Sequence, residues 1–198
     1  MPSMRKMRDA EKAVIGLSGG VDSAVAALLL KNSGFNVLGV YLKSPFARDE
    51  SGAARKAAEE LGIGFHLSDI GEALFSKVCL PFVSEYARGR TPNPCVFCNP
   101  LVKFKALSAV ADAFGAKRLA TGHYAGTAFV PSQNRFALVP GKPGHDQSYM
   151  LYRLPGEVLA RLLLPLGGMT KPEVRRLAGE NGINAAHKPD SMEICFVP

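Results

Sequence analysis

Long hydrophobic runs are missing from this sequence. Hydrophobic residues make up 47% of the chain, but no apolar stretch approaches the roughly 18 residues that a helix needs to cross a membrane. Residues 1–10 are charged and lack the apolar centre of a secretory signal. We therefore expect no membrane association and a cytoplasmic location.

Cysteine is sparse, and its pattern argues against a disulfide-stabilised protein and against a zinc-finger protein. The chain has four cysteines, and without a secretion signal they argue against a disulfide framework and suit a reducing compartment. Cys95 and Cys98 form a C-x-x-C pair, but no second pair and no Cys/His pair at zinc-finger spacing accompanies it. A four-cysteine structural zinc site is therefore not expected.

Acidic residues are outnumbered by basic ones. The chain carries 24 Lys and Arg against 17 Asp and Glu, a formal net charge of +7. Such a surplus attracts phosphate-rich partners, RNA among them. A solvated basic surface without a partner has the same composition, so charge alone does not decide between the two.

The most informative motif is Ser18-Gly19-Gly20-Val21-Asp22-Ser23, called the phosphate loop below. It joins a short apolar run to a helical one, as a phosphate-binding loop does, although a plain glycine turn is the alternative. We expect both glycines to reach positive φ and bring N–H groups close to an anion, with the serine hydroxyls as further donors. The lysine of the kinase-type loop is absent. Asp22 stands there instead, and its carboxylate would repel phosphate unless a Mg²⁺ lies between them.

Short apolar runs alternate with helical stretches, a pattern typical of a parallel sheet covered on both faces. We predict an α/β fold with a doubly wound parallel sheet. The helix after the C-x-x-C pair is expected to have Asn99 as N-cap and Pro100 in its first turn. A capping box of Thr170 and Glu173 is expected to start the last helix. The predicted strands are 13–17, 36–42, 63–67 and 118–121, and the predicted helices are 23–32, 53–61, 72–87, 100–114 and about 171–180.

Three predicted loops leave the carboxyl ends of these strands, where open parallel sheets bind ligands. They are the phosphate loop, the segment after Leu42, and Gly122-His123-Tyr124. We expect them to converge on one nucleotide, with Leu42, Gly122 and His123 as contacts. For His123, simple packing is the alternative.

The second strong signal is the stretch 90–99, in which two prolines precede Cys95 and Cys98. A thiol at a helix N-terminus ionises more easily, so we expect one or both to be partly thiolate at neutral pH. Cys195 is the third relevant thiol, whereas Cys79 lies in an apolar helix and is interpreted as an inert core residue. The pair alone fits half a zinc site, a redox pair, iron–sulfur ligands or a coincidence of structural cysteines.

Taken together, these motifs resemble the tRNA-specific 2-thiouridylase (MnmA) family of the PP-loop ATP pyrophosphatase superfamily, whose domain is adenine nucleotide alpha-hydrolase-like. The resemblance covers residues from about Lys12 to Val197. The phosphate loop alone specifies the superfamily, and the order of the later motifs is more specific. These are Gly89-Arg-Thr-Pro-Asn-Pro94, Cys98-Asn99, Ala120-Thr-Gly-His-Tyr-Ala125, Asp146-Gln-Ser-Tyr149, Pro165-Leu-Gly167, Lys171 with Glu173-Val-Arg175, and Asp190-Ser191 with Ile194-Cys-Phe196.

The resemblance implies ATP-dependent thiolation of a tRNA uridine, at the wobble position if it holds fully. ATP would adenylate the C2 oxygen, while Asp22 and Mg²⁺ offset charge on the departing pyrophosphate. Cys195 would carry a persulfide from a sulfur-donor protein, a cysteine desulfurase or a relay. Cys98 would assist sulfur release, ending in a Cys98–Cys195 disulfide.

Position 95 departs from the common family pattern, because this chain has Cys95 where Asp is frequent. Cys95, Cys98 and Cys195 are then three candidate ligands of a [4Fe–4S] cluster that leaves one iron open for sulfide. Cluster-dependent thiolation is thus an alternative to the persulfide route, and both stay open because the same thiols cannot serve both at once.

Further polar residues are candidate substrate or RNA contacts, each with a simpler alternative. Lys103 and Lys105 fit either phosphate contact or a solvated helix face. Arg88 and Arg90 can bind RNA phosphate. Asp146, Gln147 and Ser148 fit an Asx-type turn, whereas the resemblance favours nucleotide or substrate contact.

Family members continue beyond the Ile-Cys-Phe motif into further domains that help to hold the tRNA, whereas this sequence stops at Pro198. We expect residues 1–198 to form a single PP-loop domain without those C-terminal domains, either as a truncated chain or as a naturally short protein. One alternative function is sulfur transfer to, or desulfuration of, a small molecule or free base. Another is a nucleotide- or cluster-binding subunit that needs a partner chain. The oligomeric state stays open.

Overall fold

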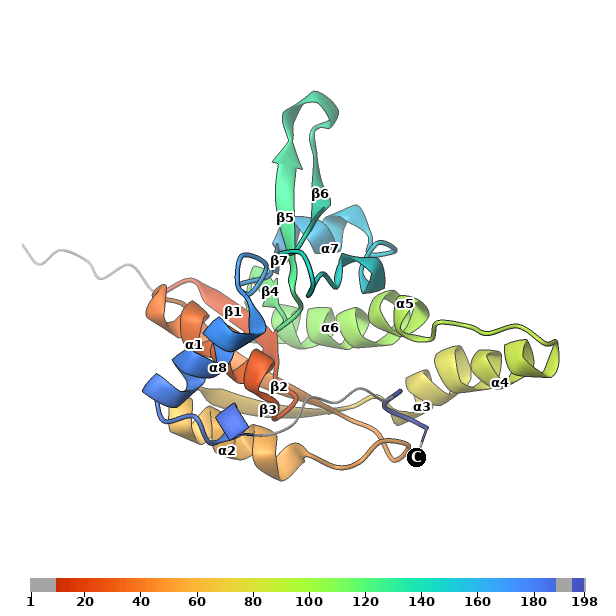
Figure 1. The fold of residues 1–198 in the computed structure, drawn as a ribbon, viewed down its shortest axis with the longest axis horizontal. Helices are drawn as coiled ribbons and strands as arrows, with labels where there is room; N and C mark the ends of the chain where they lie inside the picture. Colours follow the sequence, from red (N-terminus) through yellow and green to blue (C-terminus); the bar gives the residue numbers. More distant parts are fainter. Residues whose placement is uncertain (1–9, 188–193, 198) are drawn as a thin grey trace, which may run out of the picture.

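The computed structural model describes residues 10–187 and 194–197 (Figure 1). Its central sheet has five parallel strands in the order β3-β2-β1-β4-β7. Because β2 and β4 flank β1, the strand order reverses there, and the topological switch point lies between β1 and β4. The strands are β1 (Lys12–Gly16), β2 (Asn36–Lys43), β3 (Gly64–Asp69), β4 (Arg118–Ala120) and β7 (Leu162–Leu163).

Helices cover both faces of this sheet, which confirms the predicted doubly wound α/β fold. Successive side chains of a strand point to opposite faces, so Ile15 and Val14 of β1 enter two different hydrophobic clusters. The Ile15 cluster includes residues of α1 (Val21–Asn32), α2 (Ser51–Leu61) and α8 (Lys171–Glu180). The Val14 cluster includes residues of α6 (Phe104–Phe114) and α7 (Gly156–Arg161).

The capping box at the start of α8 is confirmed. The Thr170 backbone N–H donates to Glu173 Oε2 at 2.6 Å, and the Thr170 hydroxyl donates to the same oxygen at 2.8 Å. These contacts satisfy N-terminal groups that a helix leaves unpaired, and they fix where Lys171 begins the helix.

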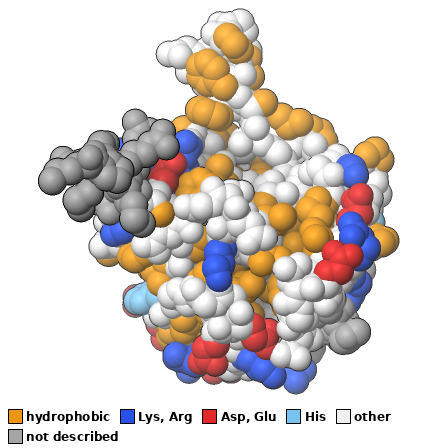
Figure 2. All heavy atoms as spheres, turned by 90° about the vertical axis from the view of Figure 1, so that its left-hand side faces the viewer, with side chains coloured by type: hydrophobic (Ala, Val, Ile, Leu, Met, Phe, Trp, Pro, Cys, Tyr) orange, Lys and Arg blue, Asp and Glu red, His pale blue; other side chains and the backbone are white. Residues whose placement is uncertain are grey.

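An antiparallel hairpin that the sequence analysis does not predict projects from the body of the fold (Figure 1). It consists of β5 (Ala125–Val130) and β6 (Arg135–Pro140), joined by a turn in which Asn134 has a positive φ of 46°. Figure 2 shows hydrophobic side chains on the part that stands clear, and Phe129 is among the exposed hydrophobic residues.

Two long helical segments each contain a π-helical turn, in which hydrogen bonds join residues five apart. One comprises α3 (Gly71–Leu74), η1 (Phe75–Cys79) and α4 (Leu80–Ala87). The other comprises α5 (Cys95–Cys98), η2 (Asn99–Lys103) and α6.

The helix expected to begin at Pro100 begins earlier, at Cys95, so the expected cap at Asn99 is wrong. Asn99 is helical, with φ −57° and ψ −60°. Pro100 has no N–H to donate to the carbonyl four residues before it. The chain instead closes a wider turn through the Phe104 N–H and the Asn99 carbonyl.

Candidate active site

The phosphate loop leaves β1 at the switch point and leads into α1. Gly19 has a φ of +81°, so it uses the left-handed conformation that favours glycine. Gly20 has a φ of −92° and acts as the N-cap residue of α1. The expectation of positive φ is therefore wrong for Gly20.

Two serine hydroxyls stabilise the loop from inside. Ser23 Oγ accepts from the Ser18 N–H at 3.1 Å and donates to the Gly20 carbonyl at 3.0 Å. Ser18 Oγ lies 3.1 Å from Ser23 Oγ and accepts from the Gly20 N–H at 3.4 Å. Val21 is buried in the core, so only its backbone is available to a ligand.

The loops after β1 and β4 meet at close range. A Cβ added to Gly122 would lie 2.8 Å from the Ser23 nitrogen and 2.9 Å from the Asp22 carbonyl carbon. Glycine is required here because no side chain fits between the two backbones. The structure thus brings Gly122 against the phosphate loop, while Leu42 is half-buried near the carboxyl end of β2.

Asp22 is held by two side chains from distant parts of the sequence. Lys171 Nζ lies 2.8 and 2.7 Å from its two carboxylate oxygens, and the Tyr124 hydroxyl donates to Oδ1 at 2.7 Å. Sequence reasoning did not assign either residue to the site, although both lie in motifs of the resemblance. Lys171 places a positive charge beside the phosphate loop. The loop itself lacks the lysine that a kinase-type loop carries.

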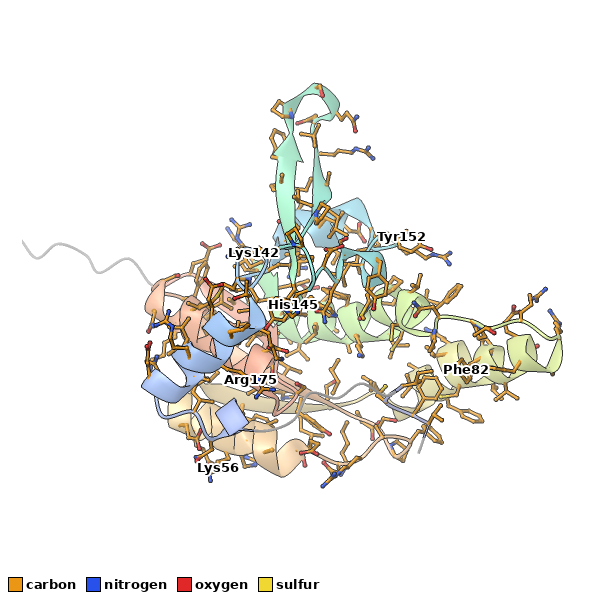
Figure 3. The ribbon with its side chains drawn as sticks, in the orientation of Figure 1. Lys56, Phe82, Lys142, His145, Tyr152 and Arg175 are labelled. Carbon is orange, nitrogen blue, oxygen red and sulfur yellow. The ribbon has the colours of Figure 1, made fainter. Side chains whose placement is uncertain are left out.

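A loop beside the first turn of α8 supports Tyr124. The Tyr124 N–H donates to Gln147 Oε1 at 3.0 Å, and the Gln147 N–H donates to the Tyr124 carbonyl at 2.8 Å. The His145 ring lies 5.9 Å from the Tyr124 ring, and Lys142 Nζ lies 3.4 Å from Glu173 Oε2 (Figure 3). Hydrogen bonds therefore link Gln147 to Asp22 through Tyr124.

Asp146 and Ser148 make an Asx-type turn. Asp146 Oδ1 accepts from the N–H groups of Gly141 at 2.7 Å and Ser148 at 3.1 Å, and Oδ2 accepts from the Ser148 hydroxyl at 2.7 Å. The Gly141 and Ser148 donors hold the Asp146 pKa below its usual value. These side chains are engaged with each other, as the simpler alternative predicts.

Cys98 is buried where the two π-containing segments pack together. Its neighbours form a hydrophobic cluster of Ile70, Leu74, Val78 and Val102. Burial raises the pKa of Cys98 to about 11. The expected thiolate at neutral pH is therefore wrong for Cys98, because desolvation outweighs the helix N-terminus.

The other cysteines gather around Cys98. Cys95 is half-buried and Cys195 is exposed, and both interact electrostatically with Cys98. Phe196 packs edge-on against Phe82 of α4 with ring centroids 5.3 Å apart, which anchors the segment carrying Cys195. Cys79 packs against the same cluster, and burial and Cys195 raise its pKa. The structure thus places Cys79, interpreted as inert, among the other thiols.

Lys103 connects the thiols with the loop after β4. In an α-helix, Lys103 would lie roughly 140° around the helix axis from Cys98. The π-helical turn instead brings residues five apart onto one face. Burial opposes its charge, yet the nearby Cys98, Cys195 and Cys95 raise the Lys103 pKa. Lys103 is half-buried beside the thiols and Lys105 is exposed, so the two lysines differ in setting.

His123 faces the same lysine. Burial, and then the Lys103 charge, lower the pKa of His123 to about 4. Its Nδ1 lies 2.8 Å from the Thr121 hydroxyl oxygen. The imidazole is therefore neutral at physiological pH.

A model of the tRNA methyl transferase HUP domain family matches residues 11–198. The chain belongs to this family. Membership in this family implies that the chain binds ATP.

Curated relatives match nearly the whole of this chain. The chain is 45% identical to "tRNA-specific 2-thiouridylase MnmA 1" of Caldanaerobacter subterraneus subsp. tengcongensis, an alignment covering 94% of this chain and 56% of that protein. It is 46% identical to "tRNA-specific 2-thiouridylase MnmA" of Geobacter metallireducens, covering 95% and 55%. The chain therefore spans about half the length of the curated relatives it matches.

Solved structures support the fold. An NMN synthetase from Francisella tularensis aligns with a TM-score of 0.55 at 23% identity, covering 92% of this chain and 67% of that one. A predicted subunit of tRNA methyltransferase from Methanocaldococcus jannaschii aligns with a TM-score of 0.53 at 20% identity, covering 86% and 76%. At identities this low, the similarity shows a shared fold and nothing about function.

The predicted RNA-contacting arginines lie beyond α4, at the end of a helical arm. Arg90 Nη2 donates to Glu85 Oε1 at 2.7 Å, and Arg90 Nε pairs with Glu85 Oε2. Arg88 lies 4.0 Å from the same carboxylate. Both arginines are exposed, and Glu85 offsets part of their charge.

The donor set does not fit a metal cluster as it stands. Within residues 10–187 and 194–197, no three His, Cys, Asp or Glu side chains are placed to hold a metal ion. Cys95, Cys98 and Cys195 are neighbours without forming such a group. The same part of the chain has no helix long and apolar enough to cross a membrane.

Proposed function

We propose that this chain is the ATP-using and sulfur-inserting part of a tRNA uridine 2-thiolase. The observation that carries the proposal is the junction at Lys103 and His123, which joins an acidic phosphate loop to a group of thiols. The names of the curated relatives support tRNA uridine as the substrate. We also propose that residues 1–198 form one PP-loop domain.

The phosphate loop activates the uridine. The C2 oxygen attacks the α-phosphate of ATP, which breaks the α–β bond, releases pyrophosphate and leaves an O-adenylated uridine. The loop backbone and the α1 N-terminus hold the phosphates, while Leu42 and Gly122 border the nucleotide. Lys171 moves from Asp22 towards the pyrophosphate as negative charge accumulates there.

Asp22 suits a Mg²⁺, because that ion is bound through one or two carboxylates together with substrate phosphates. Bound there, Mg²⁺ would neutralise charge on the departing pyrophosphate. Tyr124 keeps one Asp22 oxygen oriented after Lys171 has left, and Gln147 in turn keeps Tyr124 in place.

The thiols deliver sulfur in two steps. The terminal sulfur of a Cys195 persulfide attacks C2, AMP leaves, and a Cys195–S–S–C2 adduct forms. The Cys98 thiolate then attacks Cys195 Sγ, giving a Cys98–Cys195 disulfide and the 2-thiouridine. Lys103 stabilises the Cys98 thiolate, and the exposure of Cys195 suits loading by a sulfur-donor protein. No step passes through an iron–sulfur cluster, because the donor set does not fit one.

Pyrophosphate release from ATP, with and without unmodified tRNA, tests the proposal. We expect tRNA-dependent release by the wild-type chain and by Cys98→Ser, and a loss of at least about 100-fold in Asp22→Asn, as when a charge-stabilising group is removed. Cys98→Ser should release pyrophosphate without forming 2-thiouridine. Release that does not depend on tRNA would contradict an RNA substrate.

A further inference from the structure

Three exposed aromatic residues lie on two segments that contact each other: Phe97 between Cys95 and Cys98 in α5, and Tyr149 and Tyr152 on the turn whose Met150 carbonyl accepts from Asn99. Phe97 is 42%, Tyr149 51% and Tyr152 66% exposed. We call Phe97, Tyr149 and Tyr152 the aromatic platform. Exposed hydrophobic groups that gather in one place indicate a binding surface more often than isolated exposed residues do.

Two contacts fix the turn carrying the tyrosines onto the helix carrying the cysteines. Asn99 Nδ2 donates to the Met150 carbonyl at 3.0 Å. The Arg153 guanidinium lies 4.6 Å from the centroid of the Phe97 ring, a cation–π contact. The three rings therefore keep their positions relative to Cys98, which directly precedes Asn99.

The local conformation directs both tyrosines outward. Tyr149 lies in the 3₁₀ turn Ser148–Met150, Tyr152 follows this turn, and both residues are more than half exposed. Leu151, between the tyrosines, is fully buried and anchors the turn in the core. In Figure 3 Tyr152 projects from the molecule on the side where α5 lies.

We propose that the aromatic platform stacks unpaired RNA bases next to the uridine that reacts at the thiols. This inference rests on the proposed function. Exposed rings interleaved with an arginine are the usual means of holding single-stranded nucleic acid, because every base has a π-face. A net charge of +7 favours RNA over an apolar protein segment as the occupant.

Binding of a fluorescent RNA anticodon stem-loop, followed by anisotropy over a range of salt concentrations, tests the platform. Tyr149→Ala and Tyr152→Ala should each weaken binding by about 5- to 150-fold, the range for a lost base–aromatic stack. The slope of log K against log salt should not change, because every phosphate contact remains. Tyr152→Phe keeps the ring and should bind as the wild type does. Phe129→Ala is the matched control, since Phe129 is 50% exposed but lies on the hairpin.

The outcomes separate the platform from the proposed function. If the wild-type chain binds RNA and both alanine variants bind equally well, the platform is overturned and the proposed function stands. If Tyr152→Phe is as weak as Tyr152→Ala, the hydroxyl rather than the ring makes the contact, and stacking is overturned. If the wild-type chain neither binds the stem-loop nor releases pyrophosphate with tRNA, the proposed function fails as well.

Discussion

At the residue scale, Lys103 is the least expected feature. Removing even part of an ammonium's hydration is costly unless it is paired, and in the described ranges 10–187 and 194–197 no carboxylate forms an ion pair with the half-buried Lys103. The first of its neighbours is the Cys98 thiol, which a pKa of about 11 keeps neutral at physiological pH. The charge is therefore placed for an anion that forms during the reaction, and a thiolate fits that description.

Replacing Lys103 should slow every reaction of Cys98 that needs the thiolate. Lys103 lowers the Cys98 pKa against the larger effect of burial, so Lys103→Met should raise that pKa further. The rate of alkylation by iodoacetamide, followed at Cys98 by peptide mass spectrometry, should fall about tenfold for each unit by which the pKa rises. Lys105→Met removes an equal charge from an exposed position and should leave the rate unchanged. Equal effects of the two substitutions would contradict a specific role of Lys103.

His123 should make the folded state sensitive to mild acid. Its pKa is about 4 in the folded chain against 6.5 ordinarily, so the unfolded chain binds the proton more readily between these values. Stability is therefore intact above about pH 6.5 and falls towards pH 4, by up to about 3 kcal/mol. In urea unfolding at about pH 7.5 and pH 4.5, His123→Gln should lose less stability on acidification than the wild type. Equal losses would assign the acid sensitivity to other groups.

At the element scale, the site depends on how closely the loop after β4 approaches the phosphate loop. Gly122→Ala would press a methyl group against the Ser23 nitrogen, 2.8 Å away. Because backbone atoms cannot swing aside, we expect ATP binding to be lost and unfolding stability to fall by about 1–3 kcal/mol. Calorimetric titration with ATP and urea unfolding measure the two effects.

Gly126→Ala is the matched control for this substitution. Its added methyl group would meet nothing closer than the Val139 Cβ at 3.6 Å, an ordinary contact distance, and should leave ATP binding unchanged. Intact ATP binding by Gly122→Ala would show that the two loops separate when the nucleotide binds.

Part of the fold and part of the site could be predicted from the sequence. The sheet, the helices on its two faces and the Thr170 capping box follow from local patterns that operate within a few residues. The ion pair of Asp22 with Lys171 does not, because the two residues are 149 positions apart. The sequence predicts a helix start at Pro100 instead of Cys95, because Asn99 and Pro100 are ordinary helix-start signals. Only the π-helical turn allows them inside a helix. The hairpin did leave a signal, since Asn134 separates two apolar runs.

At the scale of the whole molecule, the question is whether RNA affinity follows the net charge or its placement. Glu85 neutralises part of the charge of Arg88 and Arg90 at the end of the α4 arm. Glu180 does the same for Arg176 on α8, at 2.7 Å. Glu85→Gln and Glu180→Gln therefore raise the net charge equally, but at different places on the surface.

If Arg88 and Arg90 contact RNA phosphates, Glu85→Gln should tighten tRNA binding at low salt. It should also steepen the slope of log K against log salt by roughly 0.7–0.9 for each additional phosphate that an arginine neutralises. Glu180→Gln should change the slope little, because Glu180 is the last residue of α8, which lies on the opposite side of the molecule from the α4 arm (Figure 1). Filter binding of tRNA over a salt series measures both variants. Equal steepening by both would mean that the surplus of +7 acts as a diffuse field, and the proposed contacts of the two arginines would then be wrong.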